Sequence, residues 1–180
     1  MAETVELDGS VIKFEGVFDW NETYLAIVSW FRSRRFDYFE TKNVKKSTTY
    51  GFELEYGAKG VREETDYIRY TIKLALHGYH MDNVEIIDKS GEKKQLVKAG
   101  YIEIKINPTI DLDWKHKWEG TEFKKKARTF VHEHMIKRKV DEWKDKIYYE
   151  AYQLQTKIKE AMNLEHKYSA YDARKKVIGK

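Results

Sequence analysis

The chain of 180 residues is 41% apolar and 14% aromatic with a net charge of +4, which suits one domain with a real core and excludes a disordered chain. It has no cysteine, so disulfides, thiolate metal sites and cysteine nucleophiles are excluded together. The N-terminus, MAETVELDGS, is polar and acidic, and no apolar run approaches membrane-spanning length. We therefore expect a cytoplasmic protein with no membrane partner.

A strand and then a helix are predicted at the start of the chain. Residues 11–18, VIKFEGVF, alternate apolar and charged side chains as a half-buried strand does. Asp19 and Glu22 follow as a capping-box pattern, which marks the start of a helix. Apolar residues then recur at helical spacing at Trp20, Tyr24, Ile27 and Phe31. These signals predict a helix over about residues 20–34.

The following eighty residues are typical of strands. Alternating apolar and charged positions predict strands at residues 36–44, 50–56, 66–77 and 109–118, and a hairpin over residues 84–107 that turns at Lys89-Ser90-Gly91-Glu92. Each strand has one apolar and one charged face. This pattern predicts a single antiparallel sheet that is wet on one side and covered by helices on the other.

The predicted fold class is α+β. It consists of one curved antiparallel sheet of about six to seven strands, a short helix after the first strand, and a long C-terminal helix. This element order resembles that of the START-like helix-grip superfamily over residues 11 to about 140, and the resemblance rests on topology alone. The segment GVFDWNETYLAIVSWFRSRRFDYFE is also similar to an uncharacterised family from small-celled archaea, which implies no activity.

The C-terminal helix is predicted to be too long for the domain. Residues 121–162 contain neither proline nor glycine, so a continuous helix would be about 60 Å long, against a radius of gyration of about 16 Å for a compact domain of this size. Its apolar stripe also rotates by about 130° within VHEHMI. We therefore predict a sheet domain over residues 1–135, a helical extension over 136–165 and a basic tail over 166–180.

The second part of the apolar stripe predicts a helical interface. Leaving this stripe in water would be costly, so we expect the protein to self-associate as a homo-oligomer or to dock a protein partner there. An alternative is that the helix folds back onto the first helix of the same chain. The predicted interface consists of Ile136, Val140, Trp143, Ile147, Leu154 and Ile158.

Charge is unevenly distributed and suggests a second function. Residues 121–180 hold 16 Lys and Arg against 9 Asp and Glu, a net charge of +7, whereas residues 1–120 have a net charge of −3. The alternative function is therefore an RNA- or ribosome-associated protein that binds through this basic third. A solvated helix face is the competing interpretation. The candidate contacts are Lys124, Lys125, Lys126, Lys137, Arg138, Lys139, Arg174, Lys175 and Lys176.

A ligand pocket is a further alternative. Alternation places His116 on the apolar face of a predicted strand, between Trp114 and Trp118, and Tyr70 faces the same way. The resemblance to START-like proteins implies a carrier of an apolar ligand beneath the sheet. The large aromatic side chains there favour a filled core instead, in which His116 is a core histidine.

The sequence predicts no enzyme, no metal and no cofactor. His132 and His134 lie two residues apart, so on a helix they point in nearly opposite directions and cannot bind one ion. Asp111 and Asp113 share a strand face, but neighbouring lysines favour a charge-paired surface over a catalytic pair. No glycine-rich phosphate loop and no nucleophile elbow are present in the sequence. No catalytic residue is therefore predicted.

Overall fold

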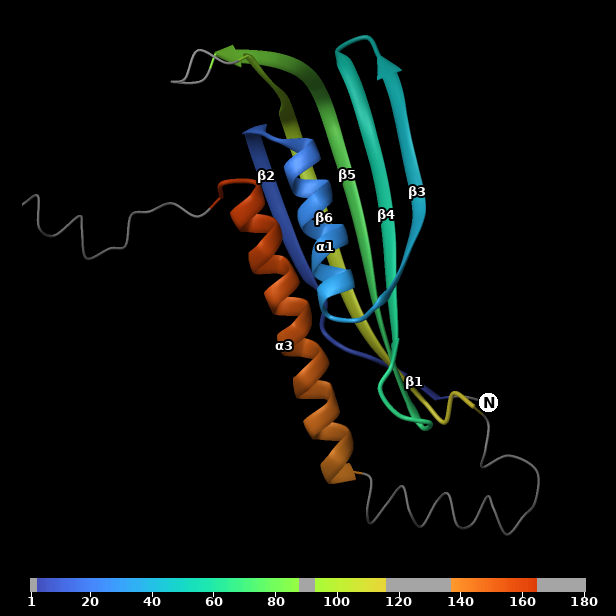
Figure 1. The fold of residues 1–180 in the computed structure, drawn as a ribbon. Helices are drawn as coiled ribbons and strands as arrows, with labels where there is room; N and C mark the ends of the chain where they lie inside the picture. Colours follow the sequence, from blue (N-terminus) through green and yellow to red (C-terminus); the bar gives the residue numbers. More distant parts are fainter. Residues whose placement is uncertain (1–2, 88–92, 116–136, 165–180) are drawn as a thin grey trace, which may run out of the picture.

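The computed structural model describes residues 3–87, 93–115 and 137–164. Within these ranges, six strands form one antiparallel sheet, and the helices α1 (Trp20–Ser33) and α3 (Lys137–Ala161) lie on the same face of it (Figure 1). The strands are β1 (Glu3–Glu6), β2 (Ser10–Phe18), β3 (Asp37–Thr48), β4 (Gly51–Glu63), β5 (Ile68–Ile87) and β6 (Lys93–Leu112).

The strand order across the sheet is β1-β6-β5-β4-β3, and β2 also pairs with β6. From β3 to β6 each strand pairs antiparallel with the next one along the chain. β1 and β2 both lie along the other side of β6, where β1 pairs with residues 109–112 and β2 with residues 97–106. The two N-terminal strands are therefore hydrogen-bonded to β6, which is the last strand in the sequence.

The predicted fold class is wrong in its element order and in its final helix. The helix α1 follows the second strand and not the first, because the short strand β1 precedes β2. The strand β1, ETVE, has only four residues and two of them are acidic, so it is too short to give a strand signal by alternation. The helix α3 has 25 residues, far fewer than the predicted helix over residues 121–162, of which residues 121–136 lie outside the described ranges.

β5 and β6 are each a single strand of 20 residues, although the sequence pattern divides them. Pro108 is the break signal in β6, because proline has no N–H for a ladder hydrogen bond. It lies opposite the junction between β1 and β2, since Glu6 pairs with Thr109 and Ser10 pairs with Ile106. β6 continues through Pro108 because neither β1 nor β2 has a strand residue paired with position 108, so no ladder hydrogen bond is lost there.

The helix α1 begins and packs as its sequence predicts. The carboxylate of Asp19 accepts a 3.0 Å hydrogen bond from the amide of Glu22, which caps the helix. At its other end the Phe31 ring presses against β4 at Gly60, where an added Cβ would lie 2.3 Å from the ring. Gly60 is thus required for the close approach of α1 to the sheet.

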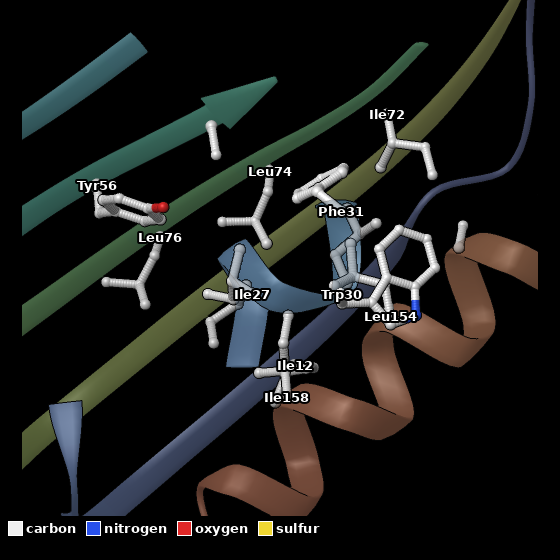
Figure 2. Packing of buried hydrophobic residues seen from close by; sticks show 14 of the residues in the cluster. Ile12, Ile27, Trp30, Phe31, Tyr56, Ile72, Leu74, Leu76, Leu154 and Ile158 are labelled. Atoms are coloured by element: carbon white, nitrogen blue, oxygen red, sulfur yellow. The ribbon is translucent and has the colours of Figure 1, made fainter. Parts of the chain in front are cut away.

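The apolar stripe of α3 is buried against the protein's own sheet and α1. Val140 is buried, and Ile147, Leu154 and Ile158 are fully inaccessible and belong to the same core as β4, β5 and β6. Figure 2 shows Leu154 and Ile158 directed toward the side chains of Trp30 and Ile12.

This burial corrects the predicted partner interface, because the stripe is already covered within one chain. Trp143 is half-buried against the same core, and Ile136 lies outside the described ranges. The fold-back alternative describes the packing of α3. The described part of the predicted extension over residues 136–165 therefore shares one core with the sheet.

Candidate functional site

The face of the sheet that points away from α1 and α3, which we call the outer face, carries regular cross-strand rows of side chains. On β5, Ile72, Leu74 and Leu76 are buried toward the helices, so Lys73, Ala75 and His77 between them point outward. The strand register places Lys59 opposite Lys73, Gly57 opposite Ala75, and Glu55 opposite His77. On the other side of β5, Lys105 lies opposite Ala75 and Glu103 opposite His77.

A hollow of about 540 Å³ lies over the row of small residues, Gly57 and Ala75. Glycine is required at position 57, because an added Cβ would lie 2.6 Å from Oγ1 of Thr41. Thr41 reaches this point because a bulge in β3 shifts the register between Glu40 and Lys42. The wall of the hollow contains Lys42, Lys59, Lys73, Lys105, Glu55, Glu103, His77 and Tyr79.

Two of the four lysines in the wall are engaged by carboxylates. Glu55 forms ion pairs with Lys42 and Lys46, and these two ammonium groups lower the pKa of Glu55 to about 2. Lys105 lies 2.6 Å from Glu103, and this contact lowers the pKa of Glu103 and raises that of Lys105. Both glutamates are therefore charged at neutral pH and compensate part of the positive charge around the hollow.

The other two lysines, Lys59 and Lys73, have no carboxylate partner in the described part of the chain. They are directly opposite each other on β4 and β5. Like charges at directly opposite positions destabilise a sheet. With four lysines and two glutamates, the wall of the hollow has two more lysines than carboxylates, and this excess is concentrated in the pair of Lys59 and Lys73.

Aromatic rings line the opposite side of the hollow from Lys59 and Lys73. The rings of His77 and Tyr79 are stacked, with centroids 3.9 Å apart and an interplanar angle of 26°. Tyr79 lies opposite Tyr101 of β6, at a centroid distance of 6.1 Å. The outer face therefore presents, in order along β5, a cationic row, a hollow and a group of planar rings.

A second polar cluster attaches α3 to the end of β4. The guanidinium of Arg62 lies 3.0 Å from Glu150 of α3 and 3.2 Å from Glu64, and it donates to the carbonyl oxygen of Arg34 at 2.9 Å. Lys146 of α3 also pairs with Glu64. A hollow of about 500 Å³ beside this cluster is lined by equal numbers of cationic and acidic side chains, so it has no charge preference for a ligand. The cluster is best explained as structural.

Of the predicted ligand pocket, the structure describes Tyr70 and Trp114. β6 ends at Leu112, because Asp113 has a φ of 53°, and Trp114 beyond it donates to the carbonyl oxygen of Thr65 at 3.0 Å. Tyr70 is fully buried in the core. His116 and Trp118 lie outside the described residues.

The other predicted site residues divide into a tested and an untested group. Asp111 accepts hydrogen bonds from Arg69 at 2.9 and 3.0 Å, so its charge-paired interpretation is confirmed, with an arginine and not a lysine as the partner. Asp113 is buried beyond the end of β6, so its predicted place on the same charged strand face is wrong. Among the described residues, no cluster of three or more acidic or histidine side chains could hold a metal ion. His132, His134 and the nucleic-acid candidates Lys124, Lys125, Lys126, Arg174, Lys175 and Lys176 lie outside the described ranges, as do the side chains of Lys137, Arg138 and Lys139.

No protein-family model matches the chain, and no curated protein matches it either. Roles for the residues of the outer face therefore come from their geometry and chemistry. None of the helices in the described ranges combines the length and apolar composition needed to cross a bilayer.

The pair of Lys59 and Lys73 was missed in the sequence, although a signal for it exists. Alternation places Lys73 on the charged face of its strand, but a strand alone does not reveal its cross-strand neighbour. The turn between β4 and β5 identifies this neighbour, because a hairpin that closes around Asp66 places residue 59 opposite residue 73. The hollow itself depends on the bulge in β3, for which the sequence gives no comparable signal.

Proposed function

We propose that the chain is a non-catalytic binding protein that takes a polyanionic partner on its outer face. The observation that carries this proposal is the juxtaposition of Lys59 and Lys73, which face each other without a carboxylate partner in the described ranges, beside a 540 Å³ hollow. An anion between the two ammonium groups would offset their repulsion and make charge-assisted contacts with both.

A purely solvated surface accounts less well for this arrangement. Other lysines around the hollow are paired with acids, since Lys42 and Lys46 pair with Glu55 and Lys105 pairs with Glu103. The unmatched pair lies beside Ala75, whose small and exposed side chain leaves space for a partner on the sheet. Repulsion at a site that is open to a ligand is the pattern expected for binding.

The partner is proposed to be extended and not a single phosphate. Lys42 and Lys105 flank the two small residues of the hollow, and Lys59 and Lys73 lie together at one end of it. The four lysines lie on four neighbouring strands, β3, β4, β5 and β6. Neighbouring strands are about 4.8 Å apart, so these positions span about 14 Å across the sheet. A polyanion can contact several of these lysines at once.

The test is the affinity of the full chain for fluorescent inorganic polyphosphate at low salt. Lys59→Gln combined with Lys73→Gln removes the unmatched pair and should weaken binding at least tenfold. Lys144→Gln combined with Lys157→Gln is the matched control, because it removes the same charge from α3, where these lysines pair with Asp141 and Glu160. The control should bind within about twofold of the wild type.

Two outcomes would overturn the proposal. One is a wild type that does not bind polyphosphate at low salt. The other is an equal loss of affinity in both double variants, because binding would then depend on net charge and not on the outer face. Circular dichroism of each variant confirms that the sheet is retained.

A further inference from the structure

We infer that the polyanion is single-stranded RNA, with bases on the rings of the outer face and phosphates at its lysines. This inference rests on the proposed function and names its partner. It is carried by the rings of His77, Tyr79 and Tyr101, which a partner made only of phosphates would not use.

The rings are placed where they can take bases. His77 and Tyr79 stack with centroids 3.9 Å apart, and Tyr101 lies beside Tyr79 on the next strand. None of these three residues is in the buried core. Base stacking on aromatic side chains of a sheet is a general way to hold single-stranded nucleic acid, because every base has a flat face.

The spacing of the lysines and the rings indicates a chain of nucleotides. Lys73 and Tyr79 are six residues apart on β5, which corresponds to about 20 Å at about 3.3 Å per residue. A single nucleotide cannot contact both ends of this track. A duplex keeps its bases stacked inside the helix, so its bases would not reach the rings.

The carboxylates in the hollow favour RNA over DNA. Glu55 and Glu103 stand among the four lysines and would repel phosphate, yet both are acceptors for a hydroxyl donor. The 2′-hydroxyl of ribose is such a donor and is the group by which a protein distinguishes RNA from DNA. Each chemical group of RNA then has a matching group on the outer face: the lysines bind phosphates, the rings stack on bases, and the carboxylates accept from ribose hydroxyls.

The test measures binding of a fluorescent oligouridine of about 12 nucleotides to the full chain. Tyr79→Leu combined with Tyr101→Leu removes two rings but keeps apolar side chains, and it should weaken binding by roughly 30-fold or more. Tyr79→Phe keeps the ring and should bind oligouridine more tightly than Tyr79→Leu does. Tyr148→Leu combined with Tyr152→Leu, at two exposed tyrosines of α3, is the matched control and should have no effect.

Inorganic polyphosphate separates this inference from the proposed function. Tyr79→Leu combined with Tyr101→Leu should weaken the binding of oligouridine far more than that of polyphosphate, whereas Lys59→Gln combined with Lys73→Gln should weaken the binding of both ligands. If loss of the rings leaves oligouridine binding unchanged, or if duplex RNA or oligodeoxyuridine binds equally well, the inference is overturned while the binding of polyphosphate still supports the proposed function. If neither oligouridine nor polyphosphate binds, both fall.

Discussion

The two faces of the sheet are built from alternating residues of the same strands, yet different forces explain them. Toward the helices, β5 presents Ile72 and Leu74, which are covered by α1 and belong to one continuous core (Figure 2). Toward the outer face, the same strand presents Lys73 and Ala75 beside a hollow. Burial accounts for the first set. The second set contains a like-charged pair that weakens the sheet, so stability does not account for it.

This difference indicates where to look for function in the molecule. Residues whose burial stabilises the fold need no functional explanation. The like charges of Lys59 and Lys73 destabilise the sheet slightly, and the pair lies beside a space large enough for a ligand.

The largest effect is expected in the core beneath α3. Leu154→Ala should lower the free energy of unfolding by about 2–5 kcal/mol, because it removes a fully buried side chain and leaves a cavity. Tyr149→Ala, on the exposed side of the same helix, should cost less than about 1 kcal/mol. Urea unfolding of both variants gives the comparison. A small effect at Leu154 would mean that α3 does not pack on the sheet.

The cluster at Arg62 should give the next largest effect. Arg62→Met removes the cation that pairs with Glu150 and leaves that mostly buried carboxylate uncompensated. Breaking such a pair from one side costs about 3 kcal/mol. The double variant Arg62→Met with Glu150→Met should recover part of this loss, since no buried charge is then unpaired. Urea unfolding of the single and double variants measures the recovery, and its absence would contradict the structural role of the pair.

The cap of α1 should contribute about 1 kcal/mol, which Asp19→Ala removes. Burial alone would raise the pKa of Asp19, but the amides of Glu22 and Asn21 and the ammonium of Lys94 outweigh it and lower the pKa. Because the folded pKa lies below the unfolded value of about 3.9, the contribution is complete above that pH and is lost as the pH falls through the folded pKa. Thermal unfolding at neutral and acid pH should show the stability difference between variant and wild type shrinking in acid.

The smallest effect is the most informative about the outer face. Lys73→Glu converts a repulsive pair into an attractive one across β4 and β5, so it should stabilise the free protein by up to about 1 kcal/mol. The same change should abolish binding of polyphosphate. Thermal unfolding and binding are measured on the same sample. A destabilised variant would show that Lys73 has a structural role, and the contrast between the two faces would then be lost.

Much of the fold was predictable because alternation and capping are local signals. The pattern of residues 11–18 and the cap at Asp19 correctly predicted β2 and the start of α1. The break at Pro108 and the acidic sequence of β1 misled the prediction, because both depend on which strand lies opposite. The direction of the apolar stripe on α3 was correct, but the surface that covers it is set by tertiary packing. That is why an internal contact was predicted as an interface between chains.

The candidate site was less predictable for the same reason. Glu55, Lys73 and His77 lie on the charged faces of predicted strands, whereas Gly57, Lys59 and Tyr79 lie beyond the predicted strand ends. The site also depends on how neighbouring strands are paired. Lys59 and Lys73 become a pair through the register of β4 and β5, and Gly57 becomes the floor of a hollow through the bulge in β3.

The most direct test of the outer face as a binding surface is to measure which lysines a bound polyanion protects from acetylation. The full chain is labelled with and without polyphosphate, and the modification of each lysine is quantified by mass spectrometry. We predict strong protection of Lys59 and Lys73 and none of Lys144 and Lys157 on α3. Protection confined to the basic residues of 121–180, with Lys59 and Lys73 labelled equally in both samples, would contradict this prediction and would move the binding site to the C-terminal third.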